Sequence, residues 1–265
     1  MVSRTEQLAE IGVIGGTGLY SLLTDAEEHT LTTPYGEPSA PLTVGEFGGR
    51  RVAFLPRHGE GHRSPPHAIN YRANLWALHA AGVRQVLAPC AVGGLRDTVA
   101  PGDLVAPDQL VDRTFRRVGS YVETGAVHLP FADPYCPRLL GVLDGADDVR
   151  TGGTMVVVEG PRFSTRAESR HYAAEGWDLI NMTGAPEAAL ARELRLCYAA
   201  VAVVTDMDAG AETGEGVGQA EVFALFGRSL DRLRSVLERV VAAAPDPGGC
   251  SCASWADDLE LTYLR

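Results

Sequence analysis

Apolar stretches of two kinds alternate along this chain. Short runs of apolar and β-branched residues predict strands at 11–14, 42–46, 51–55, 85–88, 154–158, 178–180 and 199–204. Longer stretches with apolar positions three or four residues apart predict helices at 68–81, 137–143, 165–176, 188–196 and 219–244. This alternation is typical of an α/β protein. We therefore predict a single α/β domain over residues 1–265, with a central β-sheet flanked by helices and with residues 1–10 and 246–265 as peripheral tails.

One strand-to-helix turn carries the strongest sign of ligand binding. Residues 181–187 (NMTGAPE) separate a predicted strand from a predicted helix. Pro186 suits the first helical turn, and Thr183 can cap the helix or point its hydroxyl outward. Free N–H groups at a helix start favour anions, and ligands of α/β proteins collect where strands end. We interpret this turn as the place where a ribose and a phosphate bind side by side.

Other strand ends have the composition of anion or ring sites. The turn 15–18 (GGTG) follows a strand directly, so its amides could approach an anion, although a tight turn at the sheet edge is an equal alternative. Arg57 and His58 end the strand at 51–55. We expect Arg57 to hold an anion with both arms of its guanidinium and His58 to donate a further hydrogen bond, the alternative being a solvated loop. The small residues at 89–94 would let a flat ligand lie against the backbone.

Two acids end the most apolar strand of the chain. Asp206 and Asp208 follow the run 199–204, and they share one face if the strand continues. Acids at the mouth of a buried strand are expected to have separated pKa values, which suits proton transfer to a ring nitrogen. The alternative is ordinary turn chemistry ahead of Gly210.

The loops around these acids add two more candidates. Phe163 lies between a predicted strand and the helix at 165–176, which we expect Ser164 to cap. Its ring either packs in the core or stacks on an aromatic ligand. The glycine-rich stretch 210–218 predicts a flexible lid.

Charge narrows the possible partners. The formal net charge is −11 with 34 acidic and 23 basic residues, which argues against nucleic acid and against an anionic membrane as partners. The chain contains no lysine, which excludes a lysine Schiff base and a P-loop lysine. The polar N-terminus and the absence of a long apolar run indicate a cytoplasmic protein.

The five cysteines fall into two groups. Cys90, Cys136 and Cys197 have apolar neighbours in the sequence and are interpreted as buried thiols. Cys250 and Cys252 near the end of the chain could form a redox-sensitive pair or one half of a metal site. Because two sulfurs alone make a poor zinc site, we take a plain surface loop as the default and predict no metal site.

Six motifs, in order, resemble those of the trimeric purine nucleoside phosphorylases. They are 11–18 (IGVIGGTG), 33–36 (TPYG), 56–59 (PRHG), 70–74 (NYRAN), 159–164 (EGPRFS) and 181–183 (NMT). The similarity extends from about residue 11 to about residue 242 and is greatest to the 5′-methylthioadenosine phosphorylase branch.

The resemblance implies a mixed β-sheet of the nucleoside phosphorylase type and phosphorolysis of 5′-methylthioadenosine to adenine and 5-methylthioribose 1-phosphate. Phosphate is then a co-substrate, and no metal or organic cofactor is implied. The phosphate-binding residues would be Thr17, Arg57, His58, Cys90, Ala91 and Thr183. The nucleoside-binding residues would be Phe163, Asn181, Met182, Asp206, Asp208, Gln219 and Val222, with the two acids also catalytic. His128, otherwise an ordinary loop histidine, would reach the 5′ group across the boundary of a homotrimer.

Three positions bear on the substrate. An Asp206 carboxyl can accept from a 6-amino group, and an unpaired buried acceptor costs about 1–3 kcal/mol, so adenine-type substrates are favoured. Cys90 stands where relatives often carry Thr. Gln219 and Val222 align with the 5′ pocket, and the polar Gln219 could bind a 5′-hydroxyl. The alternatives are therefore adenosine, inosine or guanosine, and 5′-halo-5′-deoxyadenosine, or a nucleotide-sensing module without turnover.

Overall fold

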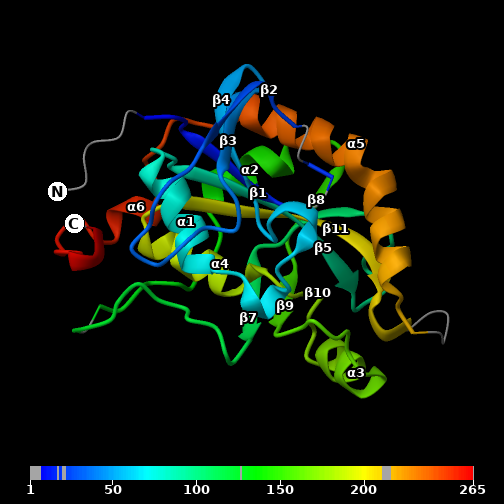
Figure 1. The fold of residues 1–265 in the computed structure, drawn as a ribbon. Coiled ribbons are helices and arrows are strands. Elements are labelled where there is room, and N and C mark those ends of the chain that lie inside the picture. The colour runs from blue at the N-terminus through cyan, green and yellow to red at the C-terminus, as the bar shows by residue number, and fades with distance from the viewer. Residues whose placement is uncertain (1–6, 17, 20–21, 126, 211–215, 265) are drawn as a thin grey trace.

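The fold is built on one mixed β-sheet. The computed structural model describes residues 7–16, 18–19, 22–125, 127–210 and 216–264 (Figure 1). The strands are β1 (Ile11–Gly15), β2 (Thr24–His29), β3 (Leu42–Phe47), β4 (Arg50–Pro56), β5 (Gln85–Gly94), β6 (Leu104–Ala106), β7 (Gln109–Arg113), β8 (Val149–Thr151), β9 (Thr154–Val158), β10 (Leu179–Asn181) and β11 (Cys197–Met207). The helices are α1 (Tyr71–Ala80), α2 (Pro137–Asp144), α3 (Arg166–Ala174), α4 (Gly184–Glu193), α5 (Gln219–Ala243) and α6 (Ser251–Ser254). The α/β class and the mixed sheet are therefore confirmed.

The strand order places four strand ends together. The main path is β2-β3-β4-β1-β5-β10-β9-β7, and β11 pairs with both β5 and β6. Strands β4, β1, β5 and β11 are parallel to one another, so their carboxyl ends meet at one edge. The last two residues of β5, Gly93 and Gly94, remain paired with β11, but on their other side they pair with β10 in the antiparallel sense, where the start of β5 pairs with β1. The sheet thus divides at the end of β5, and such a division is where α/β proteins bind ligands.

Helices cover both faces of the sheet. Along β11, Ala199, Val201 and Val203 belong to a core that also contains α2 and α5. Their neighbours in the strand, such as Ala200 and Ala202, belong to a second core that contains α1 and α4. This alternation confirms that the strand is buried on both sides.

Helix α5 shows why the spacing of apolar residues predicted a helix correctly in this part of the chain. Its buried residues Leu233, Val236, Leu237, Val240 and Val241 recur at helical spacing, and the intervening positions are exposed. One face therefore packs on the sheet and the other meets solvent.

Some predicted boundaries were wrong. Thr165, not Ser164, caps α3: its hydroxyl accepts from the amide of Glu168, whose carboxylate accepts in return from the amide of Thr165. Helix α4 ends at Glu193 because Arg195 adopts a left-handed conformation with φ of 61°. Strand β8 lies in a stretch where no strand was predicted, and its side chains are partly buried or exposed.

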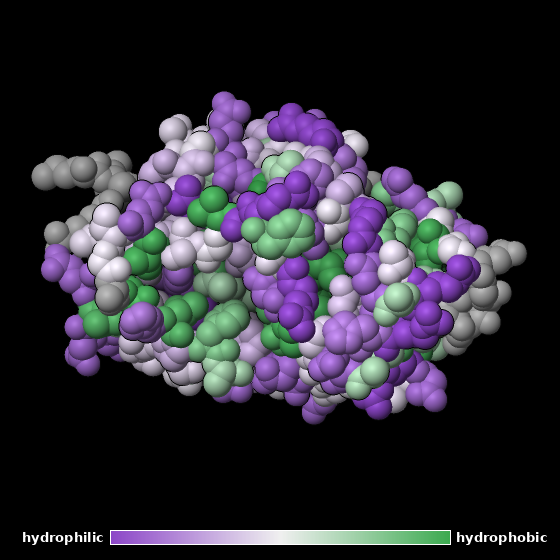
Figure 2. Space-filling view, turned by 90° about the horizontal axis from the view of Figure 1, so that it is seen from below, coloured by the Kyte–Doolittle hydropathy of each residue, from purple (hydrophilic) through white to green (hydrophobic). Residues whose placement is uncertain are grey.

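A long arm follows β7 and comprises residues 114–125 and 127–136. It runs away from the sheet at the lower side of Figure 1. Arg117 and Tyr121 fix it to the body through hydrogen bonds to carbonyl groups of Ala185 and Arg72. Phe115 and Val118 are 76% and 60% exposed on it. Figure 2 views the face on which the arm and α3 lie, and apolar side chains form patches there between polar regions.

None of the described helices is both long enough and apolar enough to cross a membrane.

Candidate active site

A cavity of about 810 Å³ opens where β4, β5, β10 and β11 end. It is lined by the predicted site residues Arg57, His58, Cys90, Ala91, Phe163, Asn181, Met182, Thr183, Asp206, Asp208, Gln219 and Val222. Thr17 lies outside the described residues, although its neighbours Gly16 and Gly18 line the cavity. His128 does not line the cavity; it lies exposed on the arm. Residues far apart in the sequence therefore meet in one place.

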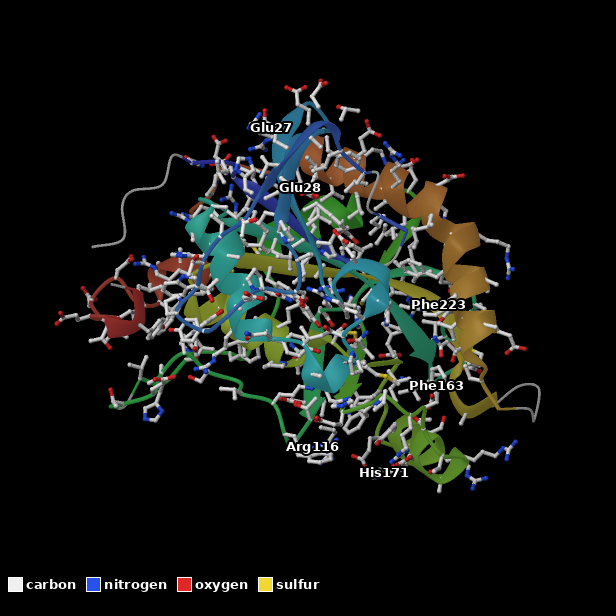
Figure 3. The ribbon with its side chains drawn as sticks, viewed as in Figure 1. Glu27, Glu28, Arg116, Phe163, His171 and Phe223 are labelled. Atoms are coloured by element: carbon white, nitrogen blue, oxygen red, sulfur yellow. The ribbon has the colours of Figure 1, made fainter. Side chains whose placement is uncertain are left out.

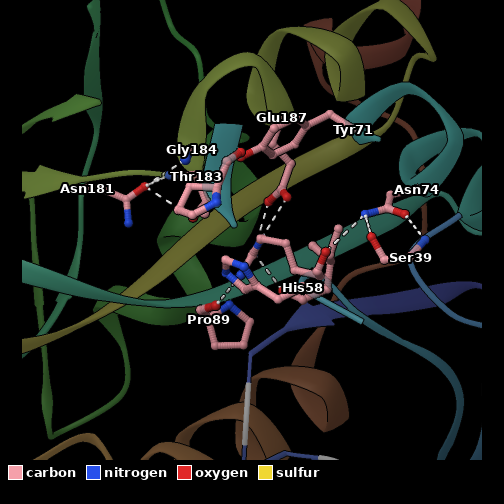
Figure 4. A network of polar contacts seen from close by, with 12 residues as sticks. Ser39, His58, Tyr71, Asn74, Pro89, Asn181, Thr183, Gly184 and Glu187 are labelled. Atoms are coloured by element: carbon pink, nitrogen blue, oxygen red, sulfur yellow. Dashed lines mark hydrogen bonds and ion pairs between the residues drawn. The ribbon is translucent and has the colours of Figure 1, made fainter. Parts of the chain in front are cut away.

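Arg57 is held by a buried carboxylate. Its Nε donates to Glu187 Oε2 at 2.8 Å and its Nη2 to Glu187 Oε1 at 2.9 Å (Figure 4). Nη1 donates to the carbonyl of Pro89, and Nη2 donates also to that of Ile14. The Arg57 and Glu187 side chains are 2% and 0% exposed. Burial alone would lower the pKa of Arg57, but the Glu187 carboxylate outweighs it, so the pKa is raised and the guanidinium stays charged.

The expected two-armed grip of Arg57 on an anion is therefore wrong. Both atoms of the guanidinium edge that would make it already bond Glu187. A guanidinium has five N–H donors, and one hydrogen on Nη1 has no protein acceptor among the described residues. Arg57 can thus offer the cavity a single N–H from a fixed position.

His58 is held as a neutral ring. Its Nδ1 lies 2.9 Å from the carbonyl oxygen of Ser64, and because a carbonyl only accepts, Nδ1 carries the hydrogen. Its ring stacks on His62 with centroids 3.9 Å apart. Burial lowers the pKa of His58 to about 3. The other nitrogen, Nε2, is then an acceptor, so the expected donation from His58 to an anion requires that the ring first gains a proton.

Asn181 organises the start of α4. Its Oδ1 accepts from the amides of Thr183 and Gly184, both at 2.7 Å (Figure 4). Its Nδ2 donates to the carbonyl of Ala91. These two amides were expected to face a bound anion, and that expectation is wrong because Asn181 already bonds them. The Thr183 hydroxyl lies 3.3 Å from the same oxygen. Asn181 thus joins the end of β5 to the start of α4 and fixes the position of Thr183.

A β-bulge places Asp206 at the cavity. The register between β5 and β11 shifts between Val204 and Asp206, so Thr205 is an extra residue that turns the strand. The Thr205 hydroxyl lies 2.7 Å from Asp206 Oδ2 and 3.1 Å from the carbonyl of Val92. Burial raises the pKa of Asp206 to about 6, and the negative charge of Asp208 adds to the rise. Asp206 is therefore an acid that can hold a proton close to neutral pH.

Asp208 lies beyond the end of β11, in the short 3₁₀ helix Asp208–Gly210. It is buried, and its Oδ2 has no hydrogen-bond partner among the described residues. Burial raises the pKa of Asp208 as well. The next residue, Ala209, has a φ of 55°, a strained conformation of the kind that collects at functional sites. A buried carboxylate oxygen without a partner at the cavity is an acceptor that a ligand could satisfy.

Apolar groups line the cavity beside the two acids. Phe163, Ile180 and Met182 contribute side chains. Gly93 forms the floor: a Cβ on it would lie 2.9 Å from Ile180 Cγ2 and 3.1 Å from Asp206 Oδ1. The absence of a side chain at Gly93 therefore leaves a flat surface next to Asp206, as expected for a site that receives a ring.

The first turns of α5 cover the opposite side. Gln219 and Val222 line the cavity there together with Phe223, Phe226 and Leu230. Phe163 and Phe223 lie at the same end of the molecule in Figure 3. The Phe223 ring meets the His62 ring edge-on at 5.7 Å. The stretch predicted to be a lid, 210–218, falls largely outside the described residues.

Several important residues had no role in the sequence analysis. Glu187 is the main one, and Tyr198 supports it by donating its hydroxyl to Glu187 Oε1 at 2.7 Å. Asn74, from the motif at 70–74, donates to the carbonyl of Arg57 and to the Ser39 hydroxyl. The signal for Glu187 was a charged residue in the otherwise apolar first turn of a helix, since a buried charge needs a partner.

Cys90 lines the cavity as a buried thiol. Burial raises the pKa of Cys90 to about 12, so it stays protonated. A thiol is a weaker hydrogen-bond donor than the hydroxyl of a threonine.

Comparisons with known proteins agree with this geometry. Residues 10–243 match the family described as the phosphorylase superfamily. Among similar proteins, a purine nucleoside phosphorylase of Streptomyces coelicolor is 56% identical over 258 residues, which is 92% of each chain. An S-methyl-5′-thioadenosine phosphorylase of Mycolicibacterium smegmatis is 54% identical over 254 residues, covering 96% of this chain and 98% of the relative.

Solved structures are similar over the same span. A methylthioadenosine phosphorylase from an antarctic soil metagenomic library has a TM-score of 0.85 at 40% identity, covering 94% of this chain and 91% of the other. The methylthioadenosine phosphorylase of Schistosoma mansoni in complex with adenine has a TM-score of 0.84 at 36% identity, covering 89% and 91%. The chain therefore belongs to the phosphorylase superfamily.

Proposed function

We propose that this protein catalyses the phosphorolysis of 5′-methylthioadenosine, giving adenine and 5-methylthioribose 1-phosphate, and that it is thus a pentosyltransferase. The observation that carries the proposal is the arrangement of one cavity: Arg57, His58 and Thr183 lie on its lining together with Asp206 and Asp208. The relatives named S-methyl-5′-thioadenosine phosphorylase cover almost the whole chain at 42–54% identity, which supports the same reaction here.

The reaction needs charge stabilised at two ends. A phosphate oxygen bonds to the anomeric carbon as the bond to purine N9 breaks, and the electron pair of that bond passes to the purine. The sugar gains positive character, which the adjacent phosphate stabilises, and the purine gains negative charge. A protonated Asp206 donates to purine N7 and relieves that charge. Positioning and electrostatics thus account for the catalysis, and phosphate is the co-substrate.

At the phosphate end we assign the free Nη1 hydrogen of Arg57, the Thr183 hydroxyl and the amides around Gly16, Thr17, Gly18 and Ala91. Phosphate enters with its own hydrogen facing His58 Nε2, or His58 takes up a proton as phosphate binds, because the Nδ1 hydrogen is bound to Ser64. In both cases one proton is bound between phosphate and His58 Nε2 when phosphate binds.

At the purine end we assign Phe163 and Met182 to the faces of the ring and the two acids to its edge. The orphaned Asp208 Oδ2 suits the 6-amino group of adenine, directly or through Asp206. In a 6-oxo purine, the acceptor O6 would face the acceptor oxygen of Asp208. Inosine and guanosine are therefore disfavoured whenever the Asp208 carboxyl is ionised.

The 5′ substituent is the open choice, and adenosine is the second candidate. Gln219 lies at the start of α5 beside Val222, and its amide can bond a 5′-hydroxyl. The purine nucleoside phosphorylase of Streptomyces coelicolor, at 56% identity, supports the same alternative.

We further propose a homotrimer in which His128 reaches the 5′ group of the partner subunit's nucleoside. The support is its exposed position on the arm, which also carries the exposed Phe115 and Val118. Native mass spectrometry gives the subunit number. His128→Ala is expected to raise the KM for the nucleoside while the KM for phosphate stays unchanged, and a monomer that turns over at full rate would contradict the proposal.

The test of the reaction is a direct comparison of substrates. Release of free base is measured for methylthioadenosine, adenosine and inosine, with and without inorganic phosphate. We expect kcat/KM to be highest for methylthioadenosine, and turnover to stop without phosphate. Base release that does not need phosphate, or inosine as the best substrate, would overturn the proposal.

A further inference from the structure

Four of the five cysteines meet in one cluster, although they come from three separate parts of the chain. The Sγ atoms of Cys136, Cys197, Cys250 and Cys252 all lie within 4.8 Å of one another. Cys250 Sγ is 3.4 Å from that of Cys197 and 4.0 Å from that of Cys136. Cys90 is not part of the cluster. Cys136 and Cys197 are buried, as expected, but each lies beside other cysteines, and the expectation of a plain surface loop is wrong for Cys252, which is 1% exposed.

The cluster has the size of a tetrahedral metal site. Zinc bonds thiolate sulfur at about 2.3 Å, which separates the sulfurs of a tetrahedron by about 3.8 Å. The distances from Cys250 Sγ to the sulfurs of Cys197 and Cys136, 3.4 and 4.0 Å, lie on either side of that value. Two disulfides need only two close pairs, whereas here all four sulfurs approach one another. One central ion requires that all four sulfur atoms lie close to one another.

The segments that carry the cysteines are firmly placed. Cys136 is the residue before α2, so it is fixed at the start of that helix. Cys197 begins β11, so it belongs to the sheet itself. Cys250 and Cys252 lie on either side of the first residue of α6.

Arginines surround the cluster and balance its charge. Four thiolates around a divalent ion carry a net charge of −2. Arg192 is buried, and its guanidinium donates to the carbonyls of Pro130 and Asp133, shortly before Cys136. Arg138 donates to the carbonyls of Asp246 and Gly248, and Arg195 donates to that of Ala253. These contacts place guanidinium groups on the chain segments next to the sulfurs.

We propose that Cys136, Cys197, Cys250 and Cys252 bind one zinc ion, which fastens the end of the chain to α2 and to the start of β11. The segment 246–264 otherwise holds to the body through contacts such as Trp255 Nε1 to the carbonyl of Arg192 and the Tyr263 hydroxyl to that of Glu193. None of the four cysteines lines the active-site cavity. The zinc is structural, because four protein ligands leave no open position for a substrate.

The first test is metal content. The protein is purified with a reductant and without chelator, then loaded with Zn²⁺ and desalted, and zinc is measured by elemental mass spectrometry. We expect about one zinc per chain. Replacement by Co²⁺ is expected to give the intense visible absorption of a tetrahedral thiolate site, and a chelator is expected to lower the melting temperature.

Variants assign the ligands. Cys250→Ser with Cys252→Ser is expected to reduce zinc to under about a tenth of an equivalent, because two thiolates alone bind zinc poorly. Cys90→Ser is the matched control and is expected to keep full zinc, since it removes a buried thiol outside the cluster. If the double variant does not fold, Cys250→Ser alone serves, because Cys250 is the one partly exposed member.

Two results would overturn the proposal. One is a loaded protein with less than about a tenth of an equivalent of zinc and four titratable thiols that Zn²⁺ does not protect. The other is an intact mass four hydrogens below that of the reduced chain after purification under reductant, which would show two disulfides. Both are independent of phosphorolysis, so they leave the proposed function untouched.

Discussion

The pair of Arg57 and Glu187 gives the sharpest test of how the site is built. Glu187→Gln keeps the shape of the side chain and removes its charge. The guanidinium then remains 2% exposed with no carboxylate beside it. Removing one partner of a buried pair costs about 3–5 kcal/mol, because the other charge stays buried without compensation. The glutamine oxygen can still accept from one arm, and the Tyr198 hydroxyl remains as a neighbour, so we expect the lower end of that range.

The loss can be measured by thermal unfolding. For a chain of this size, 1 kcal/mol shifts the melting temperature by about 2–4 °C, so a loss near 3 kcal/mol corresponds to roughly 6–12 °C. Phosphate should restore part of it. In the variant, the freed arm of Arg57 can turn to the phosphate, and a ligand that binds only the folded state raises its stability. The stabilisation by phosphate is thus expected to be larger in the variant than in the parent protein.

The matched control is Glu123→Gln. Glu123 is 69% exposed and pairs with Arg72 at 2.8 Å, the same distance as the buried pair. Solvent weakens such a pair, so the change is expected to cost under about 1 kcal/mol. A Glu187→Gln protein that melts within about 2 °C of the parent would refute the assignment of a buried, charged Arg57. So would a loss no larger than that of the control.

Four further outcomes follow from the cavity. Asp206→Ala is expected to lower kcat by about 100-fold or more, measured as adenine release, and an unchanged rate would remove its role as the acid. Since Asp206 with a pKa of about 6 is protonated below that pH, kcat/KM should fall as pH rises above it, and Asp206→Asn should flatten that limb. Gly93→Ala adds a methyl group 3.1 Å from Asp206 Oδ1 and 2.9 Å from Ile180, so the KM for the nucleoside should rise at least about tenfold while that for phosphate holds. Gln219→Leu should shift the ratio of methylthioadenosine to adenosine kcat/KM upward by about tenfold; no shift would exclude Gln219 from the 5′ pocket.

The elements that pack on both sides were predictable from the sequence. Strand β11 and helix α5 bury residues with a clear period, and a period of two or of 3.6 can be read from one sequence. β2 could not be found in this way. Its residues 24–29 (TDAEEH) are polar and mostly exposed, and only pairing with β3 makes them a strand. An edge strand of this kind has no apolar face to reveal it.

The sequence predicted which residues line the site better than it predicted which hydrogen bonds they make. Twelve of the predicted residues line one cavity because polar residues at strand ends are brought together by the parallel order of the sheet. Their hydrogen bonds depend on partners from other segments. Glu187 takes the arms of Arg57, and Ser64 takes the hydrogen of His58. A partner 130 residues away leaves no mark on the sequence near Arg57.

The charges of the cavity show how an acidic protein can bind phosphate and also release a sugar phosphate. Arg57 and Glu187 cancel each other, and His58 is neutral. Among the described residues of the lining, Arg63 is the arginine without a carboxylate partner, and it is exposed at the rim. In the proposed site, phosphate would then be held by a few directed N–H and hydroxyl donors and by a proton shared with His58, not by a surplus of fixed positive charge. Such donors distinguish one bound anion from another by geometry, because each hydrogen bond forms only with an oxygen at the right position. An anion that has moved onto the sugar carbon loses part of that match and can leave, whereas an uncompensated Arg57 would hold substrate and product phosphate alike.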